Sequence, residues 1–421
     1  MNTRTVPTNL ATELLRLLWR QGCCIDRECV SVTGEKVRVV RQGELEPETG
    51  NFTGAQVEID RVVFHGEVLI GKDARITPDA VLRVVEEPAP SILDFDDRLL
   101  PQIELHPDRQ TAELFRTLCE GASCCGCGER LAALESVHRV HLYTQLLSER
   151  LTDRLHEIRE LFETSESDWN QTFYVMLFRA MAGPANKQPY VKLASRVPYT
   201  VLSREKESAE ALLIGCSGLV EYREPKDDYL IRLLEDAHHL CHKHSIVPLR
   251  AAEWTVRGSY PAGRPLVRLA QLAAFLKDHD FLFDNALRCS SPEDVRQLFR
   301  AEASDYWRTR RIGKEKADLL GINLVAPIQY AYGDYMDDDR LRARAIDLLE
   351  RIPAEDNGTV RRWMQKGVPV GSAADSQALM QLSNVYCASV RCGMCPLGRN
   401  EIKKSLHRSS DIREKSLLLR G

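Results

Sequence analysis

The sequence lacks any run of apolar residues long enough to cross a lipid bilayer. Near the N-terminus, the apolar residues 14–19 are interrupted by Arg16 and followed by Arg20, and no small-residue cleavage site of a signal peptide comes after them. We therefore expect a cytoplasmic protein with no membrane partner.

No charge of either sign dominates the chain. Its 421 residues include 57 Lys and Arg against 61 Asp and Glu, which gives a net charge of −4. This balance excludes a globally basic, histone-like binder and leaves only local basic patches for nucleic-acid contacts. The hydrophobic fraction of 43% excludes disorder along the whole chain.

The common catalytic signatures are also missing, because no glycine-rich phosphate loop, G-x-S-x-G elbow or H-E-x-x-H motif is present. Cysteine, in contrast, is abundant. The chain has 13 cysteines, an odd number that suits a closed disulfide framework poorly. In a reducing compartment these residues are expected to be thiols or metal ligands.

Hydrophobic periodicity predicts an α+β fold, with a small N-terminal mixed or antiparallel sheet module followed by a large, mainly α-helical module. Turn residues separate short β-type runs after an initial helix. The expected strands are residues 36–41, 55–60, 61–64, 68–70 and 81–85. The expected helices are residues 12–21, 132–162, 172–181, 208–216, 229–244, 265–277, 291–304, 340–351 and 372–386. We expect the sheet module to span residues 1–105, the helical module 106–385, a cysteine knuckle 386–400 and a basic tail 401–421.

Six segments are distinctive: NFTGAQVEIDRVVFHGEVLIG (residues 51–71), PYVKLASRVP (189–198), EALLIGCSGL (210–219), RPLVRLAQLA (264–273), GINLVAPIQYAYG (321–333) and DSQALMQLSNVYCASVRCGMC (375–395). In this order they resemble the bacterial domain-of-unknown-function family 2851. The resemblance covers nearly the whole chain. The family itself is uncharacterised and therefore implies no activity.

The resemblance also indicates a nuclease-like site that this chain has lost. Family members carry an acidic residue where this chain has Asn51, and Glu and His at the positions of Leu69 and Gly71. Such a pattern is similar to the core of metal-dependent endonucleases, in which two carboxylates hold a cation that activates water. Arg83 stands where the family favours His. The catalytic residues are therefore unknown, and Asn51, Leu69 and Gly71 mark the degenerate positions.

Three C-terminal cysteines form a candidate metal site. Cys387, Cys392 and Cys395 have the spacing C-x-x-x-x-C-x-x-C, which suits zinc or an iron–sulfur cluster with one further ligand. The arrangement resembles the cysteine loop of iron–sulfur DNA glycosylases, although the spacing differs and a fourth cysteine is missing. His407, Cys216 or the glycine-rich cluster at residues 119–127 are candidates for the missing ligand. Reduced structural thiols are the alternative.

Other clusters have simpler explanations. Four cysteines at positions 119, 124, 125 and 127 are interpreted as spare thiols in a loop, and the histidines of residues 238–244 as one side of a packed helix. Arginines interleaved with aromatic residues, in contrast, favour contacts with DNA or RNA. The nucleic-acid candidates are Arg264, Arg268, Trp307, Arg308, Arg310 and Arg311, although a solvated helix face explains single basic runs equally well.

The leading hypothesis is a nucleic-acid-associated protein whose nuclease-like module has lost its metal ligands. One alternative is a structural or protein-interaction module without catalysis. The other is an active enzyme with a site in the helical body around Glu210, Arg268, Asn323 and Glu355.

Overall fold

The computed structural model describes residues 10–22, 28–46, 49–88, 93, 98–121, 126–220, 227–256 and 263–406. The chain divides into two compact units. Unit 1 comprises Met1–Leu142, Arg361–Pro369 and Leu379–Gly421, and unit 2 comprises Tyr143–Val360 and Val370–Ala378. This division differs from the four segments expected from the sequence, because residues from both ends of the chain share unit 1.

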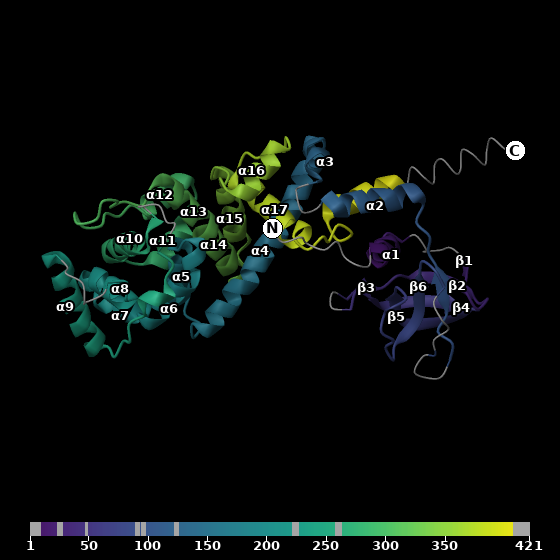
Figure 1. The fold of residues 1–421 in the computed structure, drawn as a ribbon, viewed down its shortest axis with the longest axis horizontal. Helices are drawn as coiled ribbons and strands as arrows, with labels where there is room; N and C mark the ends of the chain where they lie inside the picture. Colours follow the sequence, from purple (N-terminus) through teal and green to yellow (C-terminus); the bar gives the residue numbers. More distant parts are fainter. Residues whose placement is uncertain are drawn as a thin grey trace. The chain divides into compact units, whose positions relative to one another are not determined.

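Unit 1 contains a mixed seven-stranded sheet (Figure 1). Its strands are β1 (Glu28–Val30), β2 (Lys36–Arg41), β3 (Glu44–Leu45), β4 (Phe52–Ile59), β5 (Val62–Ile70), β6 (Ala80–Val85) and β7 (Gln102–Glu104). The order is β1-β2-β4-β5-β6-β7, and β3 pairs with β4. The expected mixed sheet followed by a large helical region is confirmed.

The sequence explains the antiparallel part of the sheet. In β2 the valines Val37 and Val39 are buried while Lys36 and Arg38 are exposed, as expected for a strand with one face in the core. β4 and β5 form a hairpin that was predicted as three shorter strands. Its two-residue turn, Asp60 and Arg61, has φ values of 47° and 72°.

β5 also pairs with β6, and this pairing is parallel. Residues 71–79 connect the two strands and return the chain to the start of β6. Gly66 allows a close approach here, because a Cβ atom at this position would lie 2.2 Å from Asp79 O and 2.5 Å from Val81 Cγ1.

Helix α1 (Leu10–Arg20) joins two hydrophobic clusters of unit 1. Leu15 and Trp19 pack with the sheet, and the Trp19 indole donates to Gln42 O at 3.0 Å. Leu14 and Leu17 pack instead with a cluster that contains Phe115, Cys392 and Ile402. The helix therefore connects the sheet to the C-terminal segment.

Helices make up most of the remaining chain (Figure 1). They are α2 (Arg109–Gly121), α3 (Gly128–Ala132), α4 (Ser136–Thr164), α5 (Trp169–Met181), α6 (Lys187–Arg196), α7 (Tyr199–Arg204), α8 (Ala209–Ser217), α9 (Asp228–Lys243), α10 (Pro265–Asp278), α11 (Leu282–Arg288), α12 (Pro292–Leu298), α13 (Lys314–Leu320), α14 (Ala326–Tyr335), α15 (Asp339–Arg351), α16 (Gly358–Gln365) and α17 (Ala373–Gln381). Two π-helical turns, η6 (Gly321–Val325) and η7 (Leu382–Cys387), precede α14 and follow α17.

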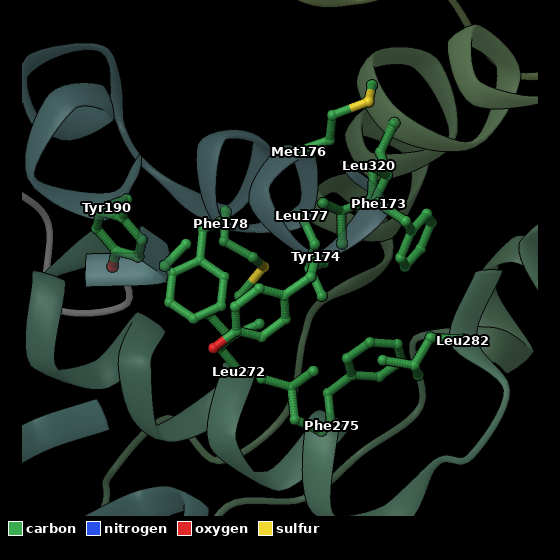
Figure 2. Close-up of a cluster of buried hydrophobic side chains, with 14 of the residues drawn as sticks. Phe173, Tyr174, Met176, Leu177, Phe178, Tyr190, Leu272, Phe275, Leu282 and Leu320 are labelled. Atoms are coloured by element: carbon green, nitrogen blue, oxygen red, sulfur yellow. The ribbon is translucent and has the colours of Figure 1, made fainter. Parts of the chain in front are cut away.

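Unit 2 is built around one large hydrophobic core. Figure 2 shows Tyr174 and Phe178 of α5 pointing toward Leu272 and Phe275 of α10. The hydroxyl group of Tyr174 donates to Val197 O at 2.8 Å, which satisfies the polar end of this buried ring. No helix of the described residues is both long and apolar enough to span a membrane.

One expected helix is too long. The sequence predicts a helix over residues 291–304, but α12 ends at Leu298. The following residues instead form a loop in which Ala303 N donates to Arg310 O at 2.9 Å and Glu302 bridges to Arg311. The loop places Trp307 in the hydrophobic core of unit 2.

We expect Gly66→Ala to destabilise the protein by about 1–3 kcal/mol, because the added methyl group meets the backbone of residue 79. Gly183→Ala is the matched control, since a Cβ there has no neighbour within 4 Å. Thermal unfolding followed by circular dichroism checks both variants. An unchanged midpoint for Gly66→Ala would contradict the close approach of β5 to the connection before β6.

Candidate functional site

A pocket of about 640 Å³ lies in unit 1, at the end of β4 and β5 opposite to the hairpin turn. Asn51 immediately precedes β4, and Gly71 immediately follows β5. Both residues line the pocket, together with residues of α1 and of the connection from β5 to β6. The structure therefore brings Asn51 and Gly71, two of the three positions expected to be degenerate, to one cavity.

The residues at these positions do not fit a divalent cation. Asn51 is 3% exposed, and its side-chain oxygen accepts a hydrogen bond from Ile70 N at 3.1 Å. Leu69 packs with Ala80 and Leu100 in a separate apolar cluster and does not line the pocket. Gly71 has a φ of +96°, and a Cβ there would lie 2.9 Å from Thr12 Oγ1, so a larger residue would be strained.

The charged groups that line the pocket are mainly basic. Arg16 and Arg75 line it together with a single carboxylate, Asp73. The Arg16 guanidinium is held in place by Gly50 O at 2.8 Å and by Glu13. Three hydroxyl side chains, those of Thr12, Thr49 and Thr77, complete the polar lining. Such a set of donors suits an anion better than a metal ion.

Arg83 lies in β6 beside Leu69 of β5. It is 1% exposed, and its Nη2 donates to Ala74 O at 2.8 Å. Its Nε and Nη1 atoms are buried without a hydrogen-bond partner in the part of the chain that the structure describes. Burial lowers the pKa of Arg83, while nearby Asp73 opposes this shift.

The three C-terminal cysteines line a small pocket of unit 1 together with a fourth cysteine. Cys387, Cys392 and Cys395 line a pocket of about 20 Å³ together with Cys127, the residue that precedes α3. The Cys392 thiol donates to Leu118 O at 3.5 Å. The described residues, these four cysteines included, contain no group of three or more His, Cys, Asp or Glu side chains that could hold a metal ion.

Two of these thiols, those of Cys127 and Cys392, have raised pKa values. Burial raises the pKa of Cys127 to about 12, and the nearby Cys395 and Cys392 add to this shift. The pKa of Cys392 is also raised, first by its hydrogen bond with Cys119 and then by burial. The thiols of Cys127 and Cys392 are therefore neutral at physiological pH.

The other candidates for a fourth ligand lie elsewhere. Cys216 is in unit 2, where its sulfur lies 3.2 Å from that of Cys241. His407 and the two cysteines at positions 124 and 125 fall outside the described residues. On α9 the histidines His238, His239 and His242 are exposed, while Cys241 is buried.

The nucleic-acid candidates of unit 2 have different surroundings. Arg264 and Arg308 are exposed and form no ion pair with the described residues. Arg310 pairs with Glu302 and Asp305, and Arg311 pairs with Glu302.

Arg268 is half-buried, and its Nη1 donates to Gln271 Oε1 at 3.0 Å. Burial lowers its pKa, and Tyr190 opposes this shift. Of the five arginines, Arg264 and Arg308 are thus the two whose charges are available at the surface.

Trp307 forms part of a partly buried hydrogen-bond network. It is 8% exposed, and its indole donates to Glu210 Oε1. Tyr229 donates to the same oxygen at 2.8 Å and contacts Ser304 Oγ at 2.7 Å. Glu210 therefore fastens the loop after α12 to α8 and α9, and the Trp307 ring is not available for stacking on a base.

The four residues of the alternative enzyme site do not share hydrogen bonds with one another. Asn323 donates to Leu319 O at 3.1 Å within the helix, and Glu355 accepts from Gln377 at 3.0 Å. Lys316, which the sequence places in the basic run after Arg311 but not among the candidate site residues, has a more unusual environment near Arg268. Its ammonium donates to Ala180 O at 2.6 Å, and burial lowers its pKa to about 7.

Comparison with known proteins places the chain in a family. The family model described as "Protein of unknown function (DUF2851)" matches residues 12–358, which is most of the chain. The chain belongs to this family. No curated protein and no solved structure matches it. The part of the chain that matches DUF2851 includes Asn51 and Cys127. Cys387, Cys392 and Cys395 lie beyond the end of this match.

We expect Glu210→Ala to destabilise the protein by about 2–4 kcal/mol, because the Trp307 indole and the Tyr229 hydroxyl lose a charged acceptor. Glu210→Gln keeps an acceptor oxygen and should cost less than about 1 kcal/mol. Denaturant unfolding followed by tryptophan fluorescence measures both changes. Equal stability of the two variants would show that Glu210 does not hold the loop.

The lowered pKa of the buried Lys316 ammonium should make the stability of the protein depend on pH. Its pKa is about 7 in the folded protein and about 10.5 in the unfolded chain, so the unfolded state binds more protons between these values. The free energy of unfolding should therefore rise with pH across this window. Lys316→Met should make the slope smaller, whereas Lys314→Met, at an exposed position, should leave it unchanged. Identical slopes in both variants would contradict the burial of the Lys316 ammonium.

Proposed function

We propose that the protein binds the phosphate backbone of DNA or RNA, with a nuclease-like sheet module that no longer cleaves it. The observation that carries this proposal is the pocket at the end of β4 and β5, because Asn51 and Gly71 line it and its charged lining is mainly basic.

The sheet topology supports a nuclease-like origin. β2, β4 and β5 are antiparallel neighbours, and β6 then pairs in parallel with β5. The ends of β4 and β5 bring together two positions at which family members are expected to carry metal-binding side chains. This arrangement would place a cation in the present pocket if those side chains were carboxylates.

The present residues support binding without cleavage. The Asn51 oxygen is already used by the backbone of β5, and neither Leu69 nor Gly71 offers a ligand. Arginines and hydroxyl groups, in contrast, are common contacts to phosphate oxygens. Arg75 is exposed and forms no ion pair with the described residues, so its charge is available to a ligand.

Unit 2 offers two further cationic side chains. Arg264 precedes α10, and Arg308 lies in the loop after α12. Because both are exposed while Arg310 and Arg311 are paired with carboxylates, Arg264 and Arg308 are the better candidates for phosphate contacts.

The experiment measures the affinity of the full chain for labelled single-stranded and double-stranded DNA and RNA at several salt concentrations. We expect Arg75→Ala to weaken binding about threefold to tenfold. The slope of log affinity against log salt concentration should become shallower by about one, because one phosphate contact is lost. Arg61→Asn is the matched control. It removes one exposed charge at the opposite end of the β4–β5 hairpin, and asparagine tolerates the φ of 72° found there.

The same assay tests unit 2. Arg308→Ala should weaken binding, whereas Arg311→Ala should have a smaller effect because Arg311 already pairs with Glu302. No cleavage is expected with Mg²⁺ or Mn²⁺. Cleavage that survives Asn51→Ala would place a catalytic site elsewhere, and a failure to bind any nucleic acid at low salt would refute the proposal.

A protein-interaction role is the second candidate. Six apolar side chains of the sheet region are exposed: Val30, Val32, Val40, Val62, Val63 and Phe64. Exposed apolar residues on neighbouring strands are typical of a surface that another protein covers. This role becomes the better explanation if nucleic acid does not bind.

A further inference from the structure

Two cysteine thiols of unit 2 lie in direct contact. Cys216 is near the end of α8, Cys241 is near the end of α9, and both are free thiols. Their sulfur atoms are 3.2 Å apart. Since a disulfide bond measures about 2.05 Å, the two sulfurs need to approach by only about 1.1 Å for a covalent bond to form.

The packing of α8 on α9 holds the two thiols in this position. A Cβ at Gly215 would lie 2.2 Å from Ala237 Cβ, so the two helices approach closely at the residue before Cys216 and one turn before Cys241. The backbone just beyond this contact is also tied down, because Leu249 N donates to Cys216 O at 2.8 Å. The fold therefore keeps the two sulfurs side by side.

The two thiols differ in their access to solvent. Cys216 is 0% exposed, and the residue after it, Ser217, accepts a hydrogen bond at its carbonyl oxygen from the buried Trp254 indole at 2.8 Å. Cys241 is 9% exposed, on a helix whose outer side carries histidines and other polar residues. A small oxidant therefore meets Cys241 before it meets Cys216.

The contact between the sulfurs also gives the two thiols different acidities. The hydrogen bond with Cys216 lowers the pKa of Cys241, and burial opposes this shift. The same hydrogen bond, followed by burial, raises the pKa of Cys216. Cys241 is therefore the thiol that more readily becomes a thiolate, which is the form that attacks an oxidant. Cys216 keeps its proton and stabilises that thiolate by donating to it.

We propose that Cys216 and Cys241 are a reversible oxidation site, at which hydrogen peroxide closes a disulfide bond between α8 and α9. The Cys241 thiolate attacks one peroxide oxygen, and the O–O bond breaks to give a sulfenic acid and hydroxide. The hydroxide takes the Cys216 proton, and the Cys216 sulfur then displaces hydroxide from the sulfenic sulfur. With the proton that Cys241 first released, two thiols and one peroxide give one disulfide and two water molecules, and two electrons pass from sulfur to oxygen.

The bond joins the two helices that hold the loop after α12. Glu210 of α8 accepts hydrogen bonds from Tyr229 of α9 and from the Trp307 indole in that loop. The two cysteines are 25 residues apart in the sequence, so the cross-link restricts the unfolded chain more than the folded one. We expect oxidation to raise the midpoint of thermal unfolding by roughly 5–10 °C.

The first experiment oxidises the full, unmodified chain with hydrogen peroxide, blocks the remaining thiols with N-ethylmaleimide and digests the protein with trypsin. Trypsin cleaves after lysine and arginine, so Cys216 and Cys241 leave on separate peptides, residues 207–223 and 233–243. We expect mass spectrometry to find these two peptides joined, and dithiothreitol to separate them. Absence of the joined peptides, or a bond from Cys241 to a different cysteine, would overturn the proposal.

Variants then assign the two roles. In Cys216→Ser, peroxide should leave Cys241 as a sulfenic acid, which dimedone labels on the peptide of residues 233–243. In Cys241→Ser, labelling of Cys216 should be about tenfold slower, because that thiol is fully buried. Faster labelling of Cys216 than of Cys241 would contradict the roles.

Cys289→Ser is the matched control. Cys289 is a buried cysteine of the same unit, and its thiol donates to Asn285 O at 3.5 Å. This variant should form the disulfide and gain thermal stability as the unmodified chain does, whereas Cys241→Ser should gain none. A rise of equal size in Cys241→Ser would show that the stabilisation comes from another pair of cysteines and would refute the cross-link between α8 and α9.

Discussion

The packing of the C-terminal segment on the first helices is the contact on which unit 1 depends. Leu14 and Leu17 of α1, Phe115 of α2 and Ile402 near the end of the described chain share one apolar cluster with Cys392. Burying a large apolar side chain contributes roughly 1.5–3 kcal/mol, so even a few such residues hold the segment firmly. Because α1 also packs on the sheet, the same helix ties the sheet to the cysteines.

Two sites of different chemistry follow from this arrangement. The pocket beside Asn51 is polar and mainly basic, and it lies where the antiparallel hairpin ends. The cysteine pocket is small and apolar, and it lies where the two ends of unit 1 meet. The two pockets share no lining residue, so the polar pocket and the cysteine pocket are independent features of unit 1.

Local patterns predicted the elements well where one face of an element is buried. The alternation of Val37 and Val39 with charged residues gives β2 its observed bounds, and the apolar spacing of α1 predicts that helix within two residues at either end. The predicted helix over residues 291–304 was too long, because the loop after Leu298 is held by contacts with Arg310 and Arg311 that no local pattern reveals.

The candidate sites were predictable only in part, because they depend on contacts between distant residues. The spacing of the last three cysteines was visible, but Cys127 is about 260 residues away and is recognised only through the fold. Similarly, Trp307 beside arginines is typical of a nucleic-acid contact in sequence, whereas in the structure its indole binds Glu210. A side chain's burial and partner, which the sequence does not show, decide its role here.

The discontinuity of unit 1 has a consequence for synthesis. Unit 2 ends at Ala378, whereas unit 1 requires residues from Leu379 onward to join those made at the start. On the ribosome, unit 2 can therefore fold before the residues from Leu379 onward, which pack on α1 and α2 of unit 1, have been synthesised. Until those residues are synthesised, Leu14, Leu17 and Phe115 lack the apolar partners that Cys392 and Ile402 provide, and such exposed apolar surface favours aggregation.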